Sequence, residues 1–163
     1  MAIDAHLKID GVQGEDPDMK HPRWIQIMSF TFSGNTGGTS QMGSGMAGGK
    51  VTCQDFVIQK YVCQASATLF KYCCAGQHLK NATVEFCRSG QTSGEQEMFM
   101  KYEFDDLMVS SFSTGGSAGD GGLPMESISF NFSKMTMEYW TWSEGKKIDQ
   151  SKTGYDLKRM TKV

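Results

Sequence analysis

Two glycine-rich stretches of the sequence carry residue types that could do chemistry. The run GSGMAGGKVT, residues 43–52, resembles a phosphate-binding loop. In such a loop backbone amides cradle phosphates and a Ser or Thr hydroxyl after the lysine reaches Mg²⁺. Counted back from Lys50, Ser44 occupies the position of the first required glycine, and Val51 occupies the position of the hydroxyl. The following residues are largely β-branched and aromatic and favour a strand, whereas a phosphate-binding loop opens a helix. The stretch therefore does not predict nucleotide binding.

The second stretch, Gly115 to Gly119, matches Gly-x-Ser-x-Gly around Ser117, the pattern that presents the nucleophile of α/β-hydrolases. The residues after it, DGGLP, are a poor start for the helix which that fold requires. That fold also places its histidine after the serine, whereas all three histidines (His6, His21 and His78) precede Ser117. Other serine hydrolases order the triad differently, so enzymes as a class are weakened and not excluded. We predict no catalytic residues, and we expect surface or capping roles for the histidines.

The cysteines form an odd set of five without a Cys-x-x-Cys pair, which suits neither a disulfide framework nor a zinc site. We expect reduced, half-buried packing residues. Cys74 and His78 are four apart, but two ligands do not close a zinc site, and Gly76 is expected to end the helix between them. Neither a metal nor a cofactor is predicted. The five cysteines are Cys53, Cys63, Cys73, Cys74 and Cys87.

The length and net charge of the chain limit the class of protein to which it can belong. The 163 residues predict a single domain, residues 1–163, that buries its core without disulfides or metals. The 18 acidic and 16 basic residues give a net charge of -2, which argues against nucleic acid as a partner. The N-terminal residues do not resemble a cleavable export signal, and no apolar run approaches the roughly 18 residues of a membrane span. We expect a protein that neither inserts into membranes nor carries a cleavable signal peptide.

Short alternating runs with 19 glycines and three prolines predict a mainly β protein. Alternation is clean over 98–105 and over 127–133. Beyond Ser133 the apolar positions shift by one residue, so either a bulge near Lys134 or a change of packing environment is expected. One helix is predicted, with Ser66 as N-cap and Gly76 as its C-terminal glycine. The other expected strands are 5–9, 24–33, 51–60, 83–88 and 155–160.

The expected strand 24–33 is apolar on both sides at its start. Trp24 and Phe30 lie on one side, while Ile25 and Ile27 lie on the other, which then turns polar at Thr31. A strand that is apolar on both sides is usually covered on both sides. We therefore expect a helix or another chain to cover Ile25 and Ile27.

Taken in order, the segments closely resemble the haemolysin-coregulated protein family, Hcp, the inner-tube subunit of the bacterial type VI secretion system. The resemblance rests on the pattern Asp-x-x-x-x-Ile-x-Gly-Val-x-Gly-Glu from Asp4 to Glu15 and on the run VSSFSTGGS from Val109 to Ser117. It also includes HPRWIQIMSFTF, GKVTCQDFVIQKY and PMESISFNFSKMTMEY. It covers nearly the whole chain and weakens after Tyr139.

The resemblance implies a compact β-barrel of two packed sheets with one flanking helix and a long glycine-rich extended loop. It implies a homo-hexameric ring, and rings stacked into a hollow tube that carries effector proteins. It further implies a contractile sheath and a spike protein as partners, with assembly in the bacterial cytoplasm followed by secretion.

The resemblance also assigns residues to roles. The glycine-rich loop would contact the adjacent ring, a disordered surface loop being the alternative. The aromatic side of strand 24–33 would fill the barrel, while its isoleucine side would meet the helix or the next subunit. The ring-stacking residues would be Gln41, Met42, Ser44, Met46, Gly48 and Gly49. The lumen or cargo contacts would be Thr31, Ser113, Thr114, Gly116 and Ser117, a plain hairpin loop being the alternative for the last four. The subunit interface or core would include Trp24, Ile25, Ile27 and Phe30.

A different class of protein is the alternative reading. A small monomeric β-barrel could bind a carbohydrate or another ligand through Trp140 and Trp142, which follow the region of resemblance. Ring formation by the purified chain distinguishes the tube subunit from the monomeric binding module.

Overall fold

The computed structural model describes residues 2–38, 48–90, 95–119 and 121–163. These residues are mostly in strands, with one helix, which confirms the predicted class. No helix among them is long and apolar enough to cross a membrane. The elements are β1 (Ile3–Ile9), β2 (Ile25–Ile27), β3 (Ser29–Thr31), β4 (Gly34–Gly38), β5 (Gly48–Cys53), β6 (Phe56–Tyr61), α1 (Ala65–Ala75), β7 (His78–Ser89), β8 (Gln96–Gly115), β9 (Met125–Ser143), β10 (Lys146–Asp156) and β11 (Thr161–Lys162).

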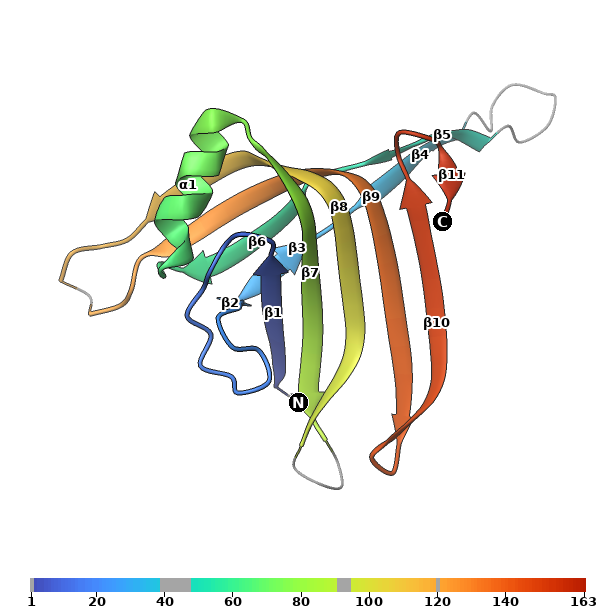
Figure 1. Cartoon of the computed structure of the whole chain (residues 1–163), viewed down its shortest axis with the longest axis horizontal. Helices are drawn as coiled ribbons and strands as arrows, with labels where there is room; N and C mark the ends of the chain where they lie inside the picture. Colours follow the sequence, from blue (N-terminus) through green and yellow to red (C-terminus); the bar gives the residue numbers. More distant parts are fainter. Residues whose placement is uncertain (1, 39–47, 91–94, 120) are drawn as a thin grey trace.

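Nine strands form one antiparallel sheet that curls around the core (Figure 1). Its order is β11-β10-β9-β8-β7-β1-β2, and β6 joins it by pairing with β9. One edge of the 19-residue strand β9 pairs with two different strands. Residues 125–130 pair with β6, and residues 134–143 pair with β10. The long, bent strands β8 and β9 therefore carry the chain from one wall of the curl to the other.

The sheet is not closed into a barrel, which corrects the barrel of two packed sheets expected from the sequence. The expected strand 24–33 is divided at Met28: β2 pairs with β1, whereas β3 pairs with β6. The two ends of the sheet thus meet on one extended segment, but the ladder is interrupted there. The second sheet does not pack on the first as a layer. It is the two-stranded ribbon β4-β5, which projects away from the curl (Figure 1).

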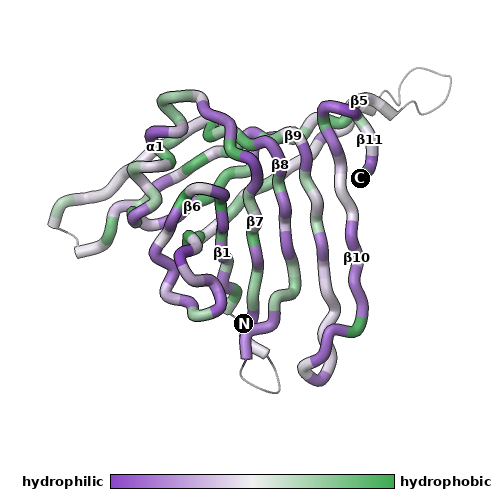
Figure 2. Tube along the Cα trace, in the orientation of Figure 1, coloured by the Kyte–Doolittle hydropathy of each residue, from purple (hydrophilic) through white to green (hydrophobic). Residues whose placement is uncertain are grey.

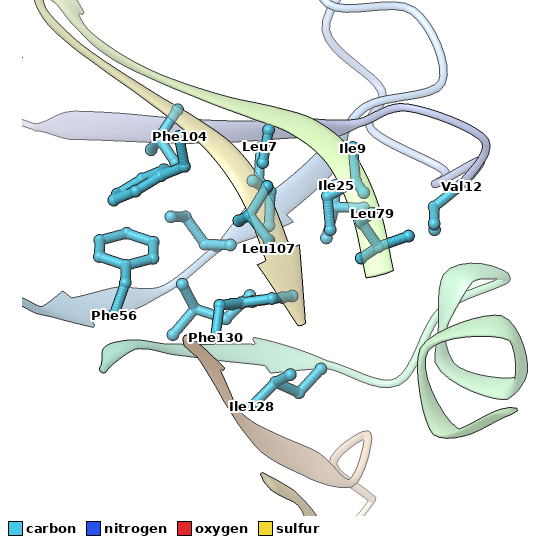
Figure 3. Close-up of a cluster of buried hydrophobic side chains, with 14 of the residues drawn as sticks. Leu7, Ile9, Val12, Ile25, Phe56, Leu79, Phe104, Leu107, Ile128 and Phe130 are labelled. Atoms are coloured by element: carbon cyan, nitrogen blue, oxygen red, sulfur yellow. The ribbon is translucent and has the colours of Figure 1, made fainter. Parts of the chain in front are cut away.

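The core lies inside the curl. Apolar side chains of β1, β2, β6, β8 and β9 converge there, among them Leu7, Ile25, Phe56, Leu107 and Phe130, all at most 1% exposed (Figure 3). Each fully buried side chain of this size contributes roughly 1.5 to 3 kcal/mol. Figure 2 shows hydropathy alternating along β7 and β8, as expected for strands with one buried face, whereas β10 is mostly hydrophilic and exposed.

Helix α1 crosses from the end of β6 to the start of β7 (Figure 1). Gly76 ends it in the left-handed conformation with φ 58°, as predicted. The predicted N-cap was wrong: Gln64 occupies that position without a side-chain hydrogen bond, and Ser66 lies inside the first turn. Ser66 instead joins a buried polar cluster, because its hydroxyl donates to Glu126 Oε2 at 2.8 Å.

One of the two alternatives expected beyond Ser133 is present, whereas the expected last strand was incorrect. The pairing of β8 with β9 passes Lys134 without a shift, so the bulge is not there; the shift lies between Val109 and Ser111. The change of packing environment is present instead. Met135 and Met137 pack against the core while the alternate positions Thr136 and Glu138 are also buried, because both faces of β9 are covered there. The expected last strand, 155–160, is mainly a turn after β10.

Candidate assembly surfaces

The outer side of β3, β6, β9 and β8 carries two rows of small polar side chains. Strand pairing aligns Ser29 with Gln59, Gln59 with Ser127 and Ser127 with Ser113. The next row aligns Thr31 with Val57, Val57 with Ser129 and Ser129 with Ser111. Residues paired across antiparallel strands point to the same side of a sheet, so both rows share one face. We call the seven polar members the hydroxyl face: Ser29, Thr31, Gln59, Ser111, Ser113, Ser127 and Ser129.

Hydrogen bonds within the hydroxyl face connect neighbouring strands. The Ser29 hydroxyl donates to Gln59 Oε1 at 3.1 Å, and the hydroxyls of Ser111 and Ser129 are 2.8 Å apart. Ser113 Oγ lies 3.4 Å from the backbone oxygen of Ser127. None of the seven side chains is charged. The face is therefore an uncharged surface, short-chained except at Gln59, that both donates and accepts hydrogen bonds.

A carboxylate marks one end of the hydroxyl face. Asp55, between β5 and β6, accepts hydrogen bonds from Ser110 Oγ at 2.5 Å and from Asn131 Nδ2 at 2.9 Å. Ser110 reaches it from the register shift in β8, where one extra residue turns toward the neighbouring strand. The carboxylate is thereby held against the sheet by two neighbours.

The structure brings together only part of the predicted lumen set. Thr31 and Ser113 lie on the hydroxyl face, whereas Thr114 pairs with Glu126 on the opposite side of the sheet. Gly116 and Ser117 lie beyond the end of β8 and line a separate hollow of about 510 Å³ with Pro124. Their place in the bore stays a prediction.

Sequence reasoning missed five members of the hydroxyl face. The alternation of Ser127 and Ser129 with apolar residues is visible in the sequence, as is that of Ser29 with its neighbours. Nothing in the sequence says that these two alternations share one face, because β6 lies between β3 and β9 in the sheet. The missed residues are Ser29, Gln59, Ser111, Ser127 and Ser129.

The ribbon β4-β5 is the described part of the glycine-rich loop. Gly48 pairs with Gly38 at its far end, and Gly49 lies against Gly37. A Cβ at Gly49 would lie 1.9 Å from the Gly37 carbonyl oxygen, so only glycine permits this approach of the two strands. Of the predicted stacking residues, Gln41, Met42, Ser44 and Met46 lie outside the described residues.

Of the two places predicted for the two isoleucines, subunit interface or core, the structure supports the core. Ile25 and Ile27 are 1% and 4% exposed and belong to the core of their own chain. Phe30 also packs inward, 4.5 Å from the Phe86 ring centroid, although it is 37% exposed. The break at Met28 explains how both sets of residues face inward, because it shifts the alternation by one residue. Trp24, half-buried, packs edge-on against His21 at 4.8 Å rather than in the barrel.

Neither of the two chemical motifs has the surroundings that its chemistry needs. The glycine run before Lys50 leads into strand β5 and not into a helix. Ser117 follows the end of β8 in irregular backbone just before a turn, and residues 121–124 are not helical. Trp140 and Trp142, the alternative ligand-binding residues, are half-buried and face Lys147, whose Nζ lies 4.5 Å and 5.5 Å from their ring centroids. Trp142 also donates its indole N–H to the Met98 carbonyl at 2.9 Å, so its polar atom is already satisfied.

The histidine expectation was wrong for two of the three. His6 and His21 are 2% and 4% exposed, whereas His78 is exposed and contacts Asp106 at 2.7 Å.

The described cysteines are free, and Cys53, Cys63 and Cys73 are half-buried as expected. Cys87 is buried, and Cys74 is exposed. His6, His21 and Cys87 together form a buried cluster.

Comparisons with known proteins agree with this architecture. The family model described as type VI secretion system effector, Hcp, matches residues 6–139. Protein hcp1 of Pseudomonas aeruginosa (strain PAO1) is 31% identical over 159 residues, which cover 97% of this chain and 93% of that protein.

Solved structures are also similar. One described as a type six secretion system protein matches with a TM-score of 0.91 and 29% identity, covering 99% of this chain and 100% of that chain. Hcp1 from Salmonella typhimurium matches with a TM-score of 0.79 and 32% identity, covering 100% of both chains. The chain therefore belongs to the Hcp family of the type VI secretion system.

Proposed function

We propose that the chain is a structural tube subunit. Six copies form a ring, rings stack into a hollow tube, and the tube carries effector proteins to its target. The hydroxyl face is the observation that carries this proposal. A bore through which different proteins pass needs short side chains, so that it stays open, and it needs no fixed charge that would trap a cargo of opposite sign. The seven side chains of the hydroxyl face carry no charge, and all of them except Gln59 are short.

The sheet geometry supports the same role. The hydroxyl face lies on the outer side of the curled sheet, away from the core, so it is available without disturbing the fold. Its side-chain hydrogen bonds link β3 to β6 and β8 to β9, and the backbone pairing of β6 with β9 joins the two halves. Weak, exchangeable hydrogen bonds from Ser and Thr hydroxyls would let cargo bind and move on.

The ribbon β4-β5 supports stacking. It projects from the body of the subunit, as an arm to a neighbouring ring must (Figure 1). In this proposal residues 41–46 reach the adjacent ring, with Gln41, Met42, Ser44 and Met46 as contacts. The tube would work with a contractile sheath and a spike protein, and would be secreted.

Exposed apolar side chains offer contacts for the neighbouring subunit in a ring. Met28, Tyr61 and Leu123 are 52%, 43% and 66% exposed and line a hollow of about 200 Å³ with Val62. Apolar side chains gathered on a surface favour contact with another protein surface. A closed ring would repeat this contact at each interface.

Light scattering of the purified chain, followed by electron microscopy of the same fraction, tests the proposal. We expect a mass near six times 18.0 kDa and ring-shaped particles. A mass of 18.0 kDa across a wide concentration range would contradict ring formation. Saturable sugar binding by that monomer would then favour the alternative module built on Trp140 and Trp142.

A further inference from the structure

Two tight turns lie at the ends of the segment that joins β1 to β2 (Figure 1). Each turn, 9–12 and 21–24, is closed by a 3.1 Å hydrogen bond from the N–H of its fourth residue to the carbonyl oxygen of its first. The third residue of each has a positive φ, which is 80° at Gly11 and 63° at Arg23. Both turns contribute residues to the lining of one hollow of about 350 Å³. A positive φ is therefore adopted by glycine in one turn and by arginine in the other.

Arginine is an unusual residue at such a position. Glycine adopts a positive φ without steric cost, whereas the Cβ of any other L-residue is crowded there. The guanidinium of Arg23 does not offset this cost within the described part of the chain, because it forms no hydrogen bond or ion pair with those residues. Residues with strained backbone are concentrated at binding and catalytic sites. The strain at Arg23 therefore indicates a role for its side chain outside the fold of the single chain.

Two further hydrogen-bond donors line the hollow beside Arg23. Lys8 Nζ lies 5.8 Å from the centroid of the Trp24 ring and forms no ion pair with the described residues. The indole N–H of the half-buried Trp24 also has no acceptor among them. The polar groups of these three side chains donate hydrogen bonds and accept none. Asp10 is the carboxylate in the lining, and it pairs with neither cation. A ligand of this hollow must therefore supply negatively charged acceptors.

We propose that this hollow binds an acidic segment of another protein chain. A carboxylate is the acceptor that fits, since the guanidinium fork of Arg23 holds both oxygens of one carboxylate and the Lys8 ammonium adds a second positive charge. The Trp24 ring offers an apolar flank for the methylene groups of a glutamate side chain. A doubly charged phosphate fits less well, because the Asp10 carboxylate borders the same space and repels it more strongly.

The hollow is a different surface from the hydroxyl face. None of the described residues that line it belongs to that face, which is built from β3, β6, β8 and β9. Docking of an acidic partner here therefore does not use the residues proposed to contact cargo. The binding site and the proposed tube can accordingly be tested separately.

Fluorescence anisotropy with two labelled peptides of equal length tests the site. One peptide alternates Ser with Glu, and the other alternates Ser with Lys. We expect the wild-type chain to bind the glutamate peptide more tightly than the lysine peptide, with an affinity that falls as salt is added. Equal binding of both peptides, or binding of neither, would overturn the proposal before any variant is made. Light scattering of the same sample reports its assembly state, so a failure to form rings is seen separately.

The variant Arg23→Gly separates recognition from stability. We expect it to weaken binding of the glutamate peptide by about tenfold. Its thermal midpoint should stay the same or rise, because glycine relieves the backbone strain, whereas loss of a side chain needed only for the fold would lower the midpoint. Glu144→Gly is the matched control, since Glu144 also has a positive φ, 50°, in the turn between β9 and β10. This control should retain peptide binding, and unchanged binding by Arg23→Gly would overturn the proposal.

A cross-link locates the bound peptide without relying on a variant. A carbodiimide joins a glutamate of the peptide to a lysine amine of the wild-type chain as an amide. Mass spectrometry of the digested product then identifies the lysine. We expect the peptide on Lys8. Cross-links confined to lysines outside the hollow, such as the exposed Lys146 of β10, would contradict the assignment.

Discussion

At the residue scale, Asp106 shows how one side chain can join segments that are distant in the sequence. Its backbone has φ 54°, and its carboxylate contacts Lys158, His78 and Ser133. These come from the C-terminal turn, β7 and β9. Hydrogen bonds from Lys158 first, then Ser133 and His78, hold the pKa of Asp106 well below its usual value of 3.8. The folded state therefore favours the ionised form.

The lowered pKa predicts acid sensitivity at this residue. A carboxylate whose pKa is depressed on folding contributes stability above its unfolded pKa and loses it as the pH falls through the folded value. Between pH 6 and pH 3, the thermal midpoint of the wild type should therefore fall further than that of Asp106→Asn. Asparagine tolerates the positive φ, so this change removes the charge without adding backbone strain. Calorimetry across this pH range measures the difference.

Asp105→Asn is the control for that experiment. Asp105 is the neighbour on the same strand and has a single ion pair, to Lys134 at 3.5 Å, with its side chain 53% exposed. Its replacement should leave the wild-type pH dependence nearly intact, because exposed pairs contribute little. Identical pH profiles for wild type and Asp106→Asn would contradict the assignment.

At the element scale, helix α1 depends on a buried ion pair as well as on apolar contact. Only Ala65, Ser66 and Leu69 of the helix are buried. Lys60 in β6 and Glu126 in β9 are 0% and 3% exposed, with Nζ 2.5 Å from Oε2. The Ser66 hydroxyl contacts both, at 2.9 Å from Lys60 Nζ and 2.8 Å from Glu126. The first turn of the helix is thus tied to two strands.

Removal of one partner of this pair should be costly. Lys60→Met leaves the Glu126 carboxylate buried without its cation, and we expect the free energy of unfolding to fall by about 3 to 5 kcal/mol. The double variant Lys60→Met with Glu126→Leu should lose less than Lys60→Met alone, because no uncompensated charge remains. Urea unfolding at one fixed protein concentration measures both.

A second lysine–glutamate pair with the same separation is the matched control. Lys152 Nζ lies 2.5 Å from Glu138 Oε1, but the lysine side chain is 56% exposed. Lys152→Met should cost less than Lys60→Met, because Lys152 is solvent-exposed and the remaining Glu138 carboxylate, although only 10% exposed, keeps the hydrogen bond from Gln150 Nε2 at 3.3 Å. A cost for Lys152→Met as large as that for Lys60→Met would mean that burial is not what makes the first pair important.

At the scale of the whole molecule, the curl of the sheet separates an apolar interior from a polar outer side, of which the hydroxyl face is an uncharged part. The hydroxyl face forms because β6 lies between β3 and β9, which aligns Ser29 and Thr31 with the serines of β8 and β9. In the proposed tube this face borders the bore. Its position away from the core lets it vary without loss of the fold.

A longer side chain on the hydroxyl face should change cargo handling and leave assembly intact. Ser113→Gln narrows the proposed bore, so we expect rings of normal mass that retain less effector in a pull-down. Ser151→Gln, at an exposed position of β10 outside the face, is the control and should retain as much effector as the wild type. Normal retention by Ser113→Gln would remove Ser113 from the bore.

Much of the fold follows from local patterns that the sequence displays. Alternation indicated most strands, Gly76 marked the end of the helix, and the resemblance led to the family. Sequence patterns fail where the structure depends on which strand pairs with which. The break at Met28 cannot be read from alternation, because it depends on which strand, β1 or β6, pairs with each half of the segment. The sequence therefore left open whether Ile25 and Ile27 face the core or a neighbouring subunit.

The sequence by itself determined the mainly β class, the helix and the family, because periodicity and glycine positions act over a few residues and motifs are contiguous. Only the tertiary structure decided the hydroxyl face and the cluster of His6, His21 and Cys87. Both are made by strand order and register, which bring residues more than sixty positions apart to within a few ångströms, as His21 and Glu85 at 2.9 Å illustrate. No spacing along the chain encodes such a neighbour, since it depends on the free energy of packing the whole sheet.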